Sequence, residues 1–287
     1  MNKKNGVVVV GSLHYDIMLN ASHQPKKGET IIGKNWFTKF GGKGGNQAIA
    51  SSSYNTPTKI ISAVGDDDFG KYILDILNAS QVNSDFIQII NEEKTGISVA
   101  ISDNDGEYGA VVISGANFKI NPDILNNSLV WQNSKILMLQ NEVNEELNIL
   151  AAKKAQMKGL RVCLNASPPK KLSHDLISNI DILIINQIEA EVISQEKISS
   201  IKEAQNISKK LTNQFSIIII TLGEEGVIVC EENNEPIHLP AKKIDVESTH
   251  GAGDVFAGIF CAALASNDDL LTAIKLANDK AAFHVSK

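Results

Sequence analysis

The sequence predicts an α/β protein with a mostly parallel central sheet covered by helices. Two observations predict this class: short β-branched runs alternate with longer segments of helical periodicity, and no repeat of roughly 20 to 50 residues is present. A succession of strand, helix and strand implies parallel strands with helices on both faces of the sheet. A chain of 287 residues is long enough for two domains or for one large α/β domain with a sizeable core.

Six runs rich in valine and isoleucine have the length and composition of buried strands. Seven other segments place apolar residues at spacings of three and four, which is typical of helices with one buried face. The expected strands are Val7–Val10, Lys59–Ala63, Ile136–Leu139, Arg161–Leu164, Ile182–Ile185 and Ile217–Thr221. The expected helices are Asn46–Ser53, Gly70–Asn78, Glu142–Lys158, Ile188–Ser194, Ile201–Leu211, Asp254–Ala265 and Leu270–Val285.

Two segments break this alternation. Residues 16–40 and 96–113 contain β-type runs without intervening helices, and Asp103-Asn104-Asp105-Gly106 is a strong turn signal. Strands that cannot join a parallel sheet by a crossover must pack elsewhere, so we expect a small antiparallel sheet that forms a lid over one end of the main sheet. The main domain would then comprise residues 1–15, 41–95 and 114–287.

The charge and apolar patterns exclude several classes of partner. The formal net charge is −6, whereas a nucleic-acid or anionic-membrane binder needs a basic footprint, so we expect neither partner. No run approaches the about 18 apolar residues of a membrane span, and the run that ends before Gly11 is too short for a signal peptide. Cys163, Cys230 and Cys261 have apolar neighbours, as reduced core cysteines do, so we expect a cytoplasmic location.

Two familiar nucleotide fingerprints fail. The segment Gly28–Lys34 has the spacing of a Walker A loop, but Asn35 stands where Ser or Thr must bind magnesium. Neither glycine-rich cluster completes the G-x-G-x-x-G pattern of dinucleotide-binding folds. Any phosphate site must therefore be built in another way.

The first glycine-rich cluster is Gly41-Gly42-Lys43-Gly44-Gly45-Asn46-Gln47-Ala48, which leads into a helix expected to begin near Asn46. Glycines allow positive φ and let a ligand approach the backbone, and Lys43 adds a charge at a helix N-terminus. The alternative is a flexible hairpin tip. Four glycines carry an entropic cost that packing alone does not offset, so a ligand site is favoured.

The second cluster is Ser248-Thr249-His250-Gly251-Ala252-Gly253-Asp254, followed by an apolar helix. Small residues ahead of a helix leave its first amides open, and these amides can hold the negative charge of a phosphoryl group in transfer. Asp254 in the first turn is either an ordinary stabiliser of the helix dipole or an acceptor for the proton of an attacking hydroxyl. Its place within a glycine-rich anion site favours the second interpretation.

These residues resemble the two signatures of the ribokinase, or PfkB, family of sugar and nucleoside kinases. Further landmarks agree in order and spacing: Gly11-Ser12 with Asp16, Gly65-Asp66-Asp67 with Gly70, Asn186-Gln187-Ile188-Glu189, and Thr221-Leu222-Gly223-Glu224-Glu225-Gly226. The resemblance covers nearly the whole chain. It implies a three-layer α/β/α fold with a small β-sheet lid, and phosphoryl transfer from ATP with Mg²⁺ to a sugar hydroxymethyl group, D-ribose first.

The resemblance also implies roles for individual residues. Asp254 matches the general base, and the amides of Gly251, Ala252 and Gly253 match the anion hole. Glu189 matches a residue that acts on magnesium indirectly, through water or phosphate. The positions that resemble sugar contacts are His14, Asp16, Gly42, Lys43, Asn46 and Glu142. Those that resemble nucleotide contacts are Asn186, Thr221, Gly223, Gly226 and Asn278.

Three departures from the family pattern limit what the resemblance implies. His14 stands where ribokinases resemble one another in using Asn, which would reshape the sugar pocket. Ser248 stands where many relatives have an Asp that helps to bind a monovalent cation, and the sequence ends at Lys287, before the segment that completes that site. We therefore do not carry potassium activation over to this chain.

Two alternatives to a sugar kinase stay open. A nucleoside kinase of the adenosine, inosine or pseudouridine type would need a larger apolar pocket under the lid. A non-catalytic sugar-binding relative would consume no ATP, although Lys43, Asn186, Glu189, Gly253 and Asp254 are all present. We also expect a homodimer, because two lids can pair through their exposed strand edges and ribokinase-like dimers are similar in this respect.

Overall fold

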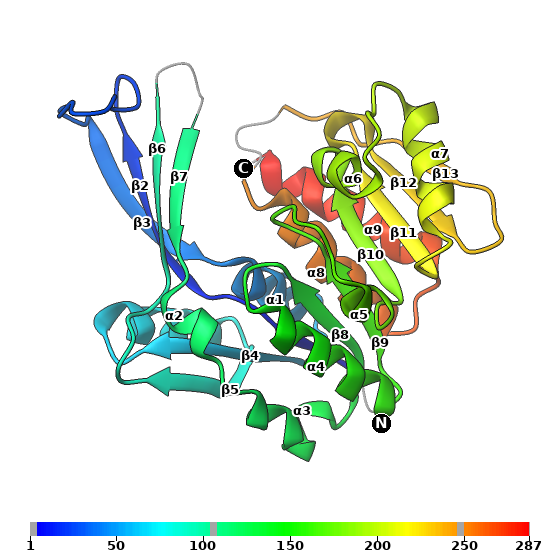
Figure 1. Ribbon diagram of the computed structural model, residues 1–287, viewed down its shortest axis with the longest axis horizontal. Coiled ribbons are helices and arrows are strands. Elements are labelled where there is room, and N and C mark those ends of the chain that lie inside the picture. Colours follow the sequence, from blue (N-terminus) through cyan, green and yellow to red (C-terminus); the bar gives the residue numbers. More distant parts are fainter. Residues whose placement is uncertain (1–4, 104–107, 246–249, 287) are drawn as a thin grey trace.

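The computed structural model describes residues 5–103, 108–245 and 250–286 (Figure 1). Within these ranges nine strands form one sheet in the order β13-β12-β11-β10-β9-β8-β1-β4-β5. The strands from β5 to β11 in this order are parallel, and β12 and β13 add an antiparallel edge. Their bounds are β1 Gly6–Val10, β4 Thr58–Gly65, β5 Asn83–Ile90, β8 Ser134–Gln140, β9 Arg161–Asn165, β10 Ile182–Asn186, β11 Ile217–Thr221, β12 Val227–Glu231 and β13 Ile237–Leu239.

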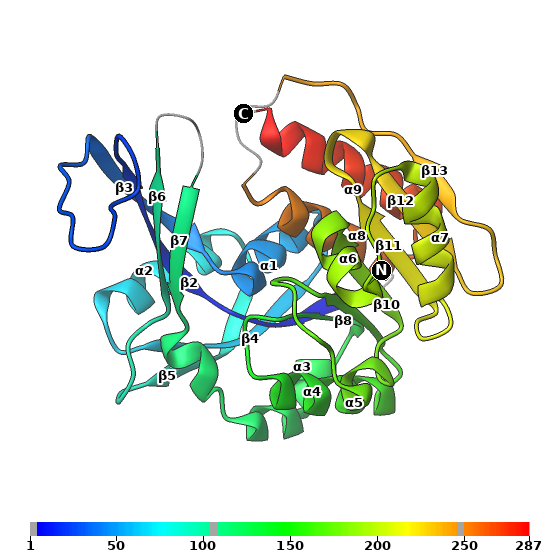
Figure 2. The same ribbon diagram turned by 45° about the horizontal axis from the view of Figure 1, so that its top comes forward.

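Helices cover both faces of this sheet, which confirms the predicted three-layer α/β/α architecture (Figures 1 and 2). One layer contains α1 Lys43–Ser53, α2 Asp68–Ala79, α8 Ala252–Ala265 and α9 Leu270–Val285. The other contains α3 Ser128–Trp131, α4 Glu145–Met157, α5 His174–Ile177, α6 Gln187–Ser194 and α7 Ile201–Leu211. Short 3₁₀ turns at Gly115–Lys119, Pro122–Asn126 and Gly223–Glu225 complete the helical segments. In the described part of the chain, no helix is long and apolar enough to cross a membrane.

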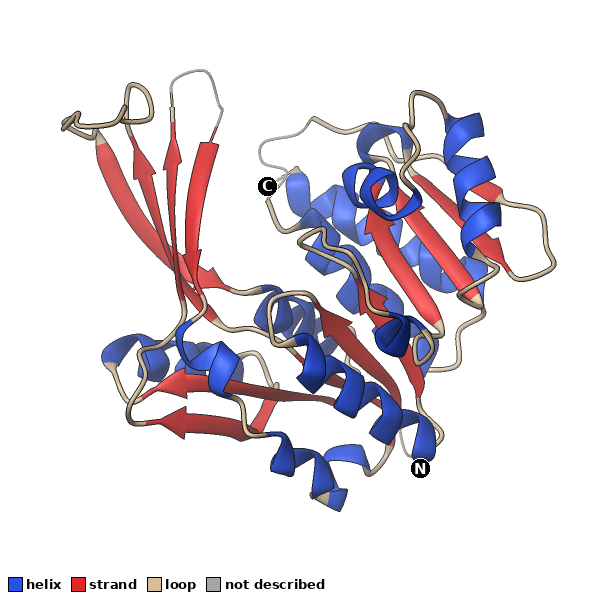
Figure 3. Ribbon diagram, in the orientation of Figure 1, coloured by secondary structure: helices blue, strands red, loops and turns tan. Residues whose placement is uncertain are grey.

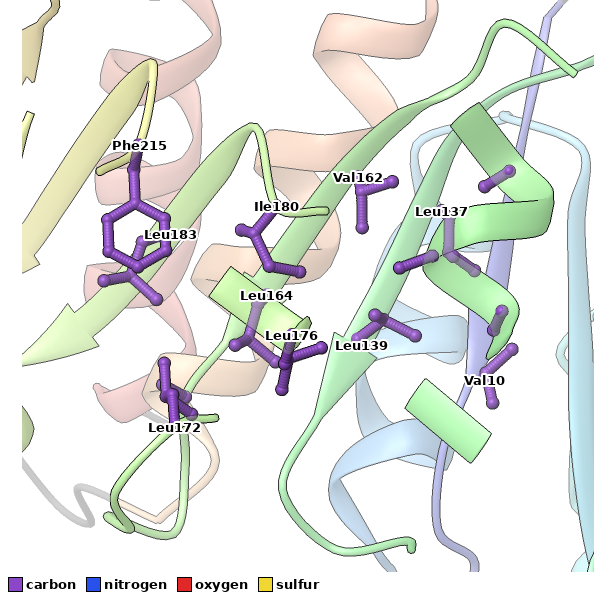
Figure 4. Packing of buried hydrophobic residues seen from close by; sticks show 14 of the residues in the cluster. Val10, Leu137, Leu139, Val162, Leu164, Leu172, Leu176, Ile180, Leu183 and Phe215 are labelled. Atoms are coloured by element: carbon purple, nitrogen blue, oxygen red, sulfur yellow. The ribbon is translucent and has the colours of Figure 1, made fainter. Parts of the chain in front are cut away.

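The β-branched runs form strands because they are buried on both faces. In β1, Val8 and Val10 pack toward the α4 side of the sheet, whereas Val7 and Val9 pack toward the α8 side. Alternate residues of a strand point to opposite faces, so an unbroken apolar run is what a covered parallel strand requires. Figure 4 shows the hydrophobic core on the α4 side of the sheet, in which Val10, Leu139 and Leu164 come from neighbouring strands.

Two predicted helix starts are wrong by three residues, whereas the other five agree with the structure to within two residues. The first helix begins at Lys43 rather than at Asn46, and α4 begins at Glu145 rather than at Glu142. In α1, close packing of the glycines overrides their low helix propensity. Glu142 stays in the loop after β8, where its carboxylate accepts a hydrogen bond from the Lys43 amide at 2.9 Å.

The smaller sheet has the order β3-β2-β6-β7 and stands away from the main domain, and its described residues form no helix (Figure 3). Its strands are β2 His14–Asn20, β3 Asn35–Gly41, β6 Ile97–Ser102 and β7 Tyr108–Ile113. The expectation of an antiparallel sheet is correct for the β2–β3 and β6–β7 pairs and wrong for the central pair, because β2 and β6 are parallel. Both hairpins leave the main domain in the same direction, so their first strands run side by side. Residues 104–106 of the expected turn lie outside the described residues.

Side-chain hydrogen bonds fix the main-domain segments that lead into and out of the lid. Asn117 accepts a hydrogen bond from the Leu13 amide and donates one to the Leu13 carbonyl, both at 2.9 Å. Asp67 accepts from the amide and the hydroxyl of Thr95, just before β6. These bonds satisfy buried polar groups where the chain passes between the two sheets. The assignment of 16–40 and 96–113 to a separate lid unit stays a prediction.

Candidate active site

A cavity of about 900 Å³ lies between the lid and the carboxyl ends of the main-sheet strands. The lid sheet forms one wall, and the opposite wall contains the ends of β9 to β11 and the N-termini of α1 and α8. Ligands of open α/β sheets bind outside the carboxyl ends of the strands. The residues that line this cavity include His14, Asp16, Lys39, Gly42, Lys43, Asn46, Glu142, Asn165, Asn186, Glu189, Thr221, His250, Gly251, Gly253 and Asp254.

A second cavity, of about 730 Å³, adjoins the first. Thr221 and Gly253 line both cavities, so the two meet at the N-terminus of α8. The second cavity also contains the predicted nucleotide residues Gly223, Gly226 and Asn278. The first cavity thus contains every residue that the sequence assigned to sugar contacts. The second cavity contains the segment after β11.

The N-terminus of α8 separates the two cavities. Gly251 precedes the helix with φ of 80° and no capping side chain, and Val255 donates the first intrahelical bond to its carbonyl. The amides of residues 252–254 therefore have no intrahelical acceptor. A Cβ built on Gly253 would meet nothing within 4 Å. This geometry leaves backbone donors facing open space, which suits an anion.

Asp254 is buried, with 6% of its surface exposed, and two amide side chains hold its carboxylate. Gln47 donates to Oδ1 at 2.9 Å and Asn46 donates to Oδ2 at 3.2 Å. Burial raises the pKa of Asp254, whereas Lys43 and the two amide donors lower it. A carboxylate with a raised pKa that still accepts hydrogen bonds is a suitable proton acceptor.

The N-terminus of α1 differs from this arrangement. Gly42 has φ of 88°, and the following Lys43 amide donates to Glu142, which also accepts from the Ser12 hydroxyl. The glycines of this cluster are required mainly for close packing: a Cβ on Gly44 would lie 2.6 Å from the Gly11 backbone. Only Gly42 among them has the positive φ that the sequence led us to expect.

His14 and Asp16 project from β2 into the first cavity. Asp16 is buried and accepts a hydrogen bond from the Ser98 hydroxyl at 2.6 Å. His14 is 3% exposed, and its Nε2 has no hydrogen-bond partner among the described residues. Burial lowers the pKa of His14 against the opposing effects of Glu142 and Asp16, so the ring is neutral at pH 7 and can exchange hydrogen bonds with a neutral hydroxyl.

Asn186 and Glu189 form a capping box at the start of α6. The Asn186 side chain accepts from the Glu189 amide, and the Glu189 side chain accepts from the Asn186 amide, both at 2.8 Å. Burial raises the pKa of Glu189. Groups of three or more metal-binding side chains are absent from the described ranges. One buried carboxylate fits Mg²⁺ that keeps water and phosphate ligands, rather than a metal enclosed by protein.

The second cavity is lined by glycine backbone and by four charged side chains, Glu224, Glu225, Lys242 and Lys243. Gly226 has φ of 96°, and a Cβ there would lie 2.2 Å from the Leu239 carbonyl oxygen. Asn278 donates to the Pro240 carbonyl at 3.1 Å and so holds the segment that follows β13 against α9. Ser248, the residue that bears on the monovalent cation, lies outside the described residues.

Sequence reasoning missed Gln47, Asn165, Lys39 and His250. Gln47 is fully buried and donates to Asn165 as well as to Asp254. Asn165 ends β9, and a polar residue at the carboxyl end of a buried strand was the signal that could have found it. Lys39 and His250 line the cavity from β3 and from the residue before Gly251. Lys39 belongs to no local pattern that indicates a ligand, whereas His250 stands in the second glycine-rich cluster but was assigned no role there.

This fold, with a lid over a cleft that is divided by an open helix N-terminus, defines a class of phosphate-handling α/β proteins. The chain belongs to the pfkB family of carbohydrate kinases, whose match covers residues 4–287.

Individual relatives agree with this family. A ribokinase of Staphylococcus aureus is 31% identical over 99% of this chain and 94% of that protein. The structure of Arabidopsis thaliana ribokinase complexed with ribose and ATP has a TM-score of 0.91 and 28% identity, covering 99% of this chain and 93% of the other. A ribokinase of Cryptococcus neoformans in complex with ADP has a TM-score of 0.85 and 28% identity, covering 99% and 94%. The ribokinase-like fold expected from the sequence is confirmed.

Proposed function

We propose that this protein transfers the γ-phosphoryl group of ATP to the hydroxymethyl group of a sugar, D-ribose first, giving ribose 5-phosphate and ADP. The carrying observation is the position of Asp254, whose buried carboxylate lies at the helix N-terminus where the two cavities meet. Similarity to ribokinases over nearly the full chain supports the same activity.

Asp254 acts as the general base in this proposal. It orients the sugar hydroxyl, whose oxygen attacks the γ-phosphorus while the bond to ADP breaks, and it receives the hydroxyl proton late in the transfer. The amides of Gly251, Ala252 and Gly253 hold the charge that spreads over the phosphoryl oxygens. Lys43, at the N-terminus of α1 in the same wall of the cavity, adds a positive charge.

The sugar would bind at the end of the first cavity that is closed by the lid. Asp16 and Glu142 accept hydrogen bonds from its hydroxyls, and Asn46 can donate or accept. The Nε2 of His14, which is buried without a partner among the described residues, would exchange a further hydrogen bond with a hydroxyl. The Gly42 backbone would lie against the sugar ring. Closure of the lid would exclude water, which otherwise competes as the phosphoryl acceptor.

The nucleotide would occupy the second cavity, along Thr221, Gly223 and Gly226, with Asn278 near the adenine. Asn186 would donate its side-chain NH₂ to a phosphate oxygen, because its carbonyl oxygen already caps α6. Glu189 would hold Mg²⁺ indirectly, through water or phosphate. When bound, Mg²⁺ neutralises charge on the β- and γ-phosphates.

An ATP-turnover screen tests this proposal. The panel contains ribose, deoxyribose, fructose, tagatose, adenosine, inosine and pseudouridine, each with and without potassium. We expect ribose-dependent ADP formation that disappears when magnesium is chelated. No turnover with any compound would contradict a kinase and would favour a non-catalytic sugar-binding relative instead.

A nucleoside kinase is the second candidate, because the lid wall of the first cavity carries apolar side chains beside its polar ones. Met18, Phe37 and Val112 line it from the lid sheet. Such a surface can cover a base attached to the sugar. Turnover with a nucleoside that exceeds turnover with ribose would select this candidate.

The outer face of the lid supports a homodimer. Trp36, Val111 and Ile113 have 66%, 66% and 55% of their surface exposed, on strands that include both edges of the lid sheet. A second copy of this lid would cover these residues and the edges. A monomeric mass in solution would contradict the dimer.

Three free cysteines support a reducing compartment, such as the cytoplasm.

A further inference from the structure

Gln47 connects the candidate base to the main sheet through a chain of buried hydrogen bonds. Its Nε2 donates to Asn165 Oδ1 at 3.0 Å and to Asp254 Oδ1 at 2.9 Å. Asn165 in turn donates its Nδ2 to the Ile184 carbonyl in β10 at 3.1 Å. The chain therefore runs from a backbone group of the rigid sheet to the Asp254 carboxylate.

The direction of every bond in this chain is determined by chemistry. The Ile184 carbonyl can only accept, so Asn165 must present Nδ2 to it and Oδ1 to Gln47. Gln47 must then present its NH₂ group, and the second hydrogen of that group points at Asp254. The opposite amide orientation would place an oxygen against the carboxylate. Both hydrogens of the Gln47 amide are thus used, and its Oε1 has no partner among the described residues.

Gln47 itself does not line the first cavity, whereas Asn46 and Asp254 do. Gln47 holds Oδ1 on the buried side of the carboxylate, and Asn46 lies beside Oδ2. We propose that Gln47, held by Asn165, is a positioning residue that fixes the Asp254 carboxylate so that Oδ2 faces the substrate hydroxyl. This inference rests on the proposed function of Asp254 as the base.

The charged groups around Asp254 make the contribution of Gln47 measurable. Lys43 from α1 favours the ionised carboxylate, and Glu142 after β8 disfavours it. Glu189 at the start of α6 and His250 before α8 also interact with it electrostatically. The Gln47 hydrogen bond lowers the pKa of Asp254. Removal of this hydrogen bond leaves the four titratable groups in place and raises the pKa of Asp254 further.

The test compares Gln47→Met, which keeps the side-chain length but removes the donor, with the wild-type protein. The pKa of Asp254 is measured by ¹³C NMR on protein with labelled aspartate carboxyls, the signal being assigned with Asp254→Asn. We expect it to rise by about one unit, the size of a hydrogen bond to a charged group. With ribose and ATP, we expect kcat to fall about 10- to 100-fold, its acid limb to move up by the same unit, and the sugar Kd to stay unchanged.

Two further variants separate positioning from a structural role. Asn148 is equally buried and donates one hydrogen bond, to the Gln140 carbonyl at 2.7 Å, and it makes no hydrogen bond to Gln47 or Asp254 among the described residues. Asn148→Leu should lower stability without moving the acid limb. Gln47→Glu keeps the shape and places a carboxylate against Asp254, so it should raise the Asp254 pKa even if Gln47→Met does not fold.

The outcomes distinguish this inference from the proposed function. An unchanged Asp254 pKa in folded Gln47→Met overturns the inference, whatever the activity. An unchanged kcat in that variant does the same when the wild type phosphorylates ribose. A wild type that turns over no compound contradicts the proposed function alone, and the NMR measurement still decides whether Gln47 controls the carboxylate.

Discussion

The two helices that begin at the active-site cavity, α1 and α8, show how one local device serves two purposes. Both follow a glycine with positive φ, Gly42 at 88° and Gly251 at 80°. At α1, the Glu142 carboxylate of the same chain accepts a hydrogen bond from the first amide. At α8, no capping side chain is seen within the described ranges, and the amides face the two cavities.

The difference shows that a carboxylate of the same chain, when it occupies a helix N-terminus, gives that N-terminus a structural role in place of a ligand-binding one. Glu142 links α1 to the loop after β8 and to Ser12, so it organises the sugar end before any ligand binds. The amides of α8 keep their donor capacity for a ligand anion. The side chains of Asn46 and Gln47, near the start of α1, donate hydrogen bonds to Asp254 in the first turn of α8.

The largest expected effect is on Asp254, which belongs to the open N-terminus. Asp254→Asn should lower kcat by about 10²–10⁴, the usual contribution of a general base, and leave sugar affinity nearly intact. Steady-state kinetics and calorimetric sugar binding measure the two quantities. If the variant keeps most of its kcat, Asp254 is not the base, and the open N-terminus of α8 would then have no catalytic role that distinguishes it from the N-terminus of α1.

A pair of alanine substitutions tests the contrast in packing. Gly44→Ala places a Cβ 2.6 Å from the Gly11 backbone and should lower the free energy of unfolding by about 1–3 kcal/mol. Gly253→Ala adds a methyl group that meets no neighbour within 4 Å, so stability should change by less than about 0.5 kcal/mol while kcat falls. Chemical unfolding and kinetics on both variants provide the check. Equal destabilisation by the two substitutions would remove the distinction.

Glu142 should contribute to stability as a cap. Glu142→Ala leaves the Lys43 amide and the Ser12 hydroxyl without their acceptor and should cost about 0.5–2 kcal/mol, whereas Glu142→Gln keeps an oxygen acceptor and should cost less. Urea unfolding of both variants without ligand measures this. A neutral Glu142→Ala would show that α1 does not depend on this carboxylate.

The smallest expected effect is pH-dependent and comes from His14, beside Glu142. Because burial lowers its folded pKa below the ordinary value of 6.5, the unfolded chain binds the proton first as pH falls. The stability contributed by neutral His14 is therefore complete above pH 6.5 and decreases below it, by at most about 1.4 kcal/mol per pH unit. Unfolding free energies between pH 7.5 and 5, about one unit on each side of this pKa, measure the slope. His14→Asn should remove that part of it, and an unchanged slope would contradict the assignment.

Six of the nine strands described in the main sheet could be predicted because they are covered on both faces. The other three, β5, β12 and β13, lie at or next to the sheet edges and are not among the expected strands. Runs such as Ile217–Thr221 are buried through four successive residues, so hydrophobicity alone marks them. The start of α1 could not be predicted, because the fit of Gly44 against Gly11 is a tertiary contact that outweighs propensity. The direction of β6 relative to β2 follows from how the two hairpins leave the main domain, which no local pattern records.

The candidate site shows the same division. Asp254, Gly251 and Lys43 stand in short glycine-rich segments that are visible in the sequence. The pairing of Gln47 with Asn165 joins residues 118 positions apart, and only the fold brings them together. A glutamine inside a helix has no feature that separates it from a solvated one before its burial is known.

The capping box of Asn186 and Glu189 has a consequence for how relatives of this protein diverge. Each of the two residues satisfies the other's backbone amide at the start of α6, so replacing either one carries a folding penalty independent of catalysis. A descendant that lost its phosphoryl-transfer activity would keep the N-x-x-E pair for that reason alone. The presence of the pair therefore indicates common ancestry more reliably than it indicates activity. Burial raises the pKa of Asp254 and so disfavours its charged form. Loss of Asp254 would therefore be the better sign that a relative has lost phosphoryl-transfer activity.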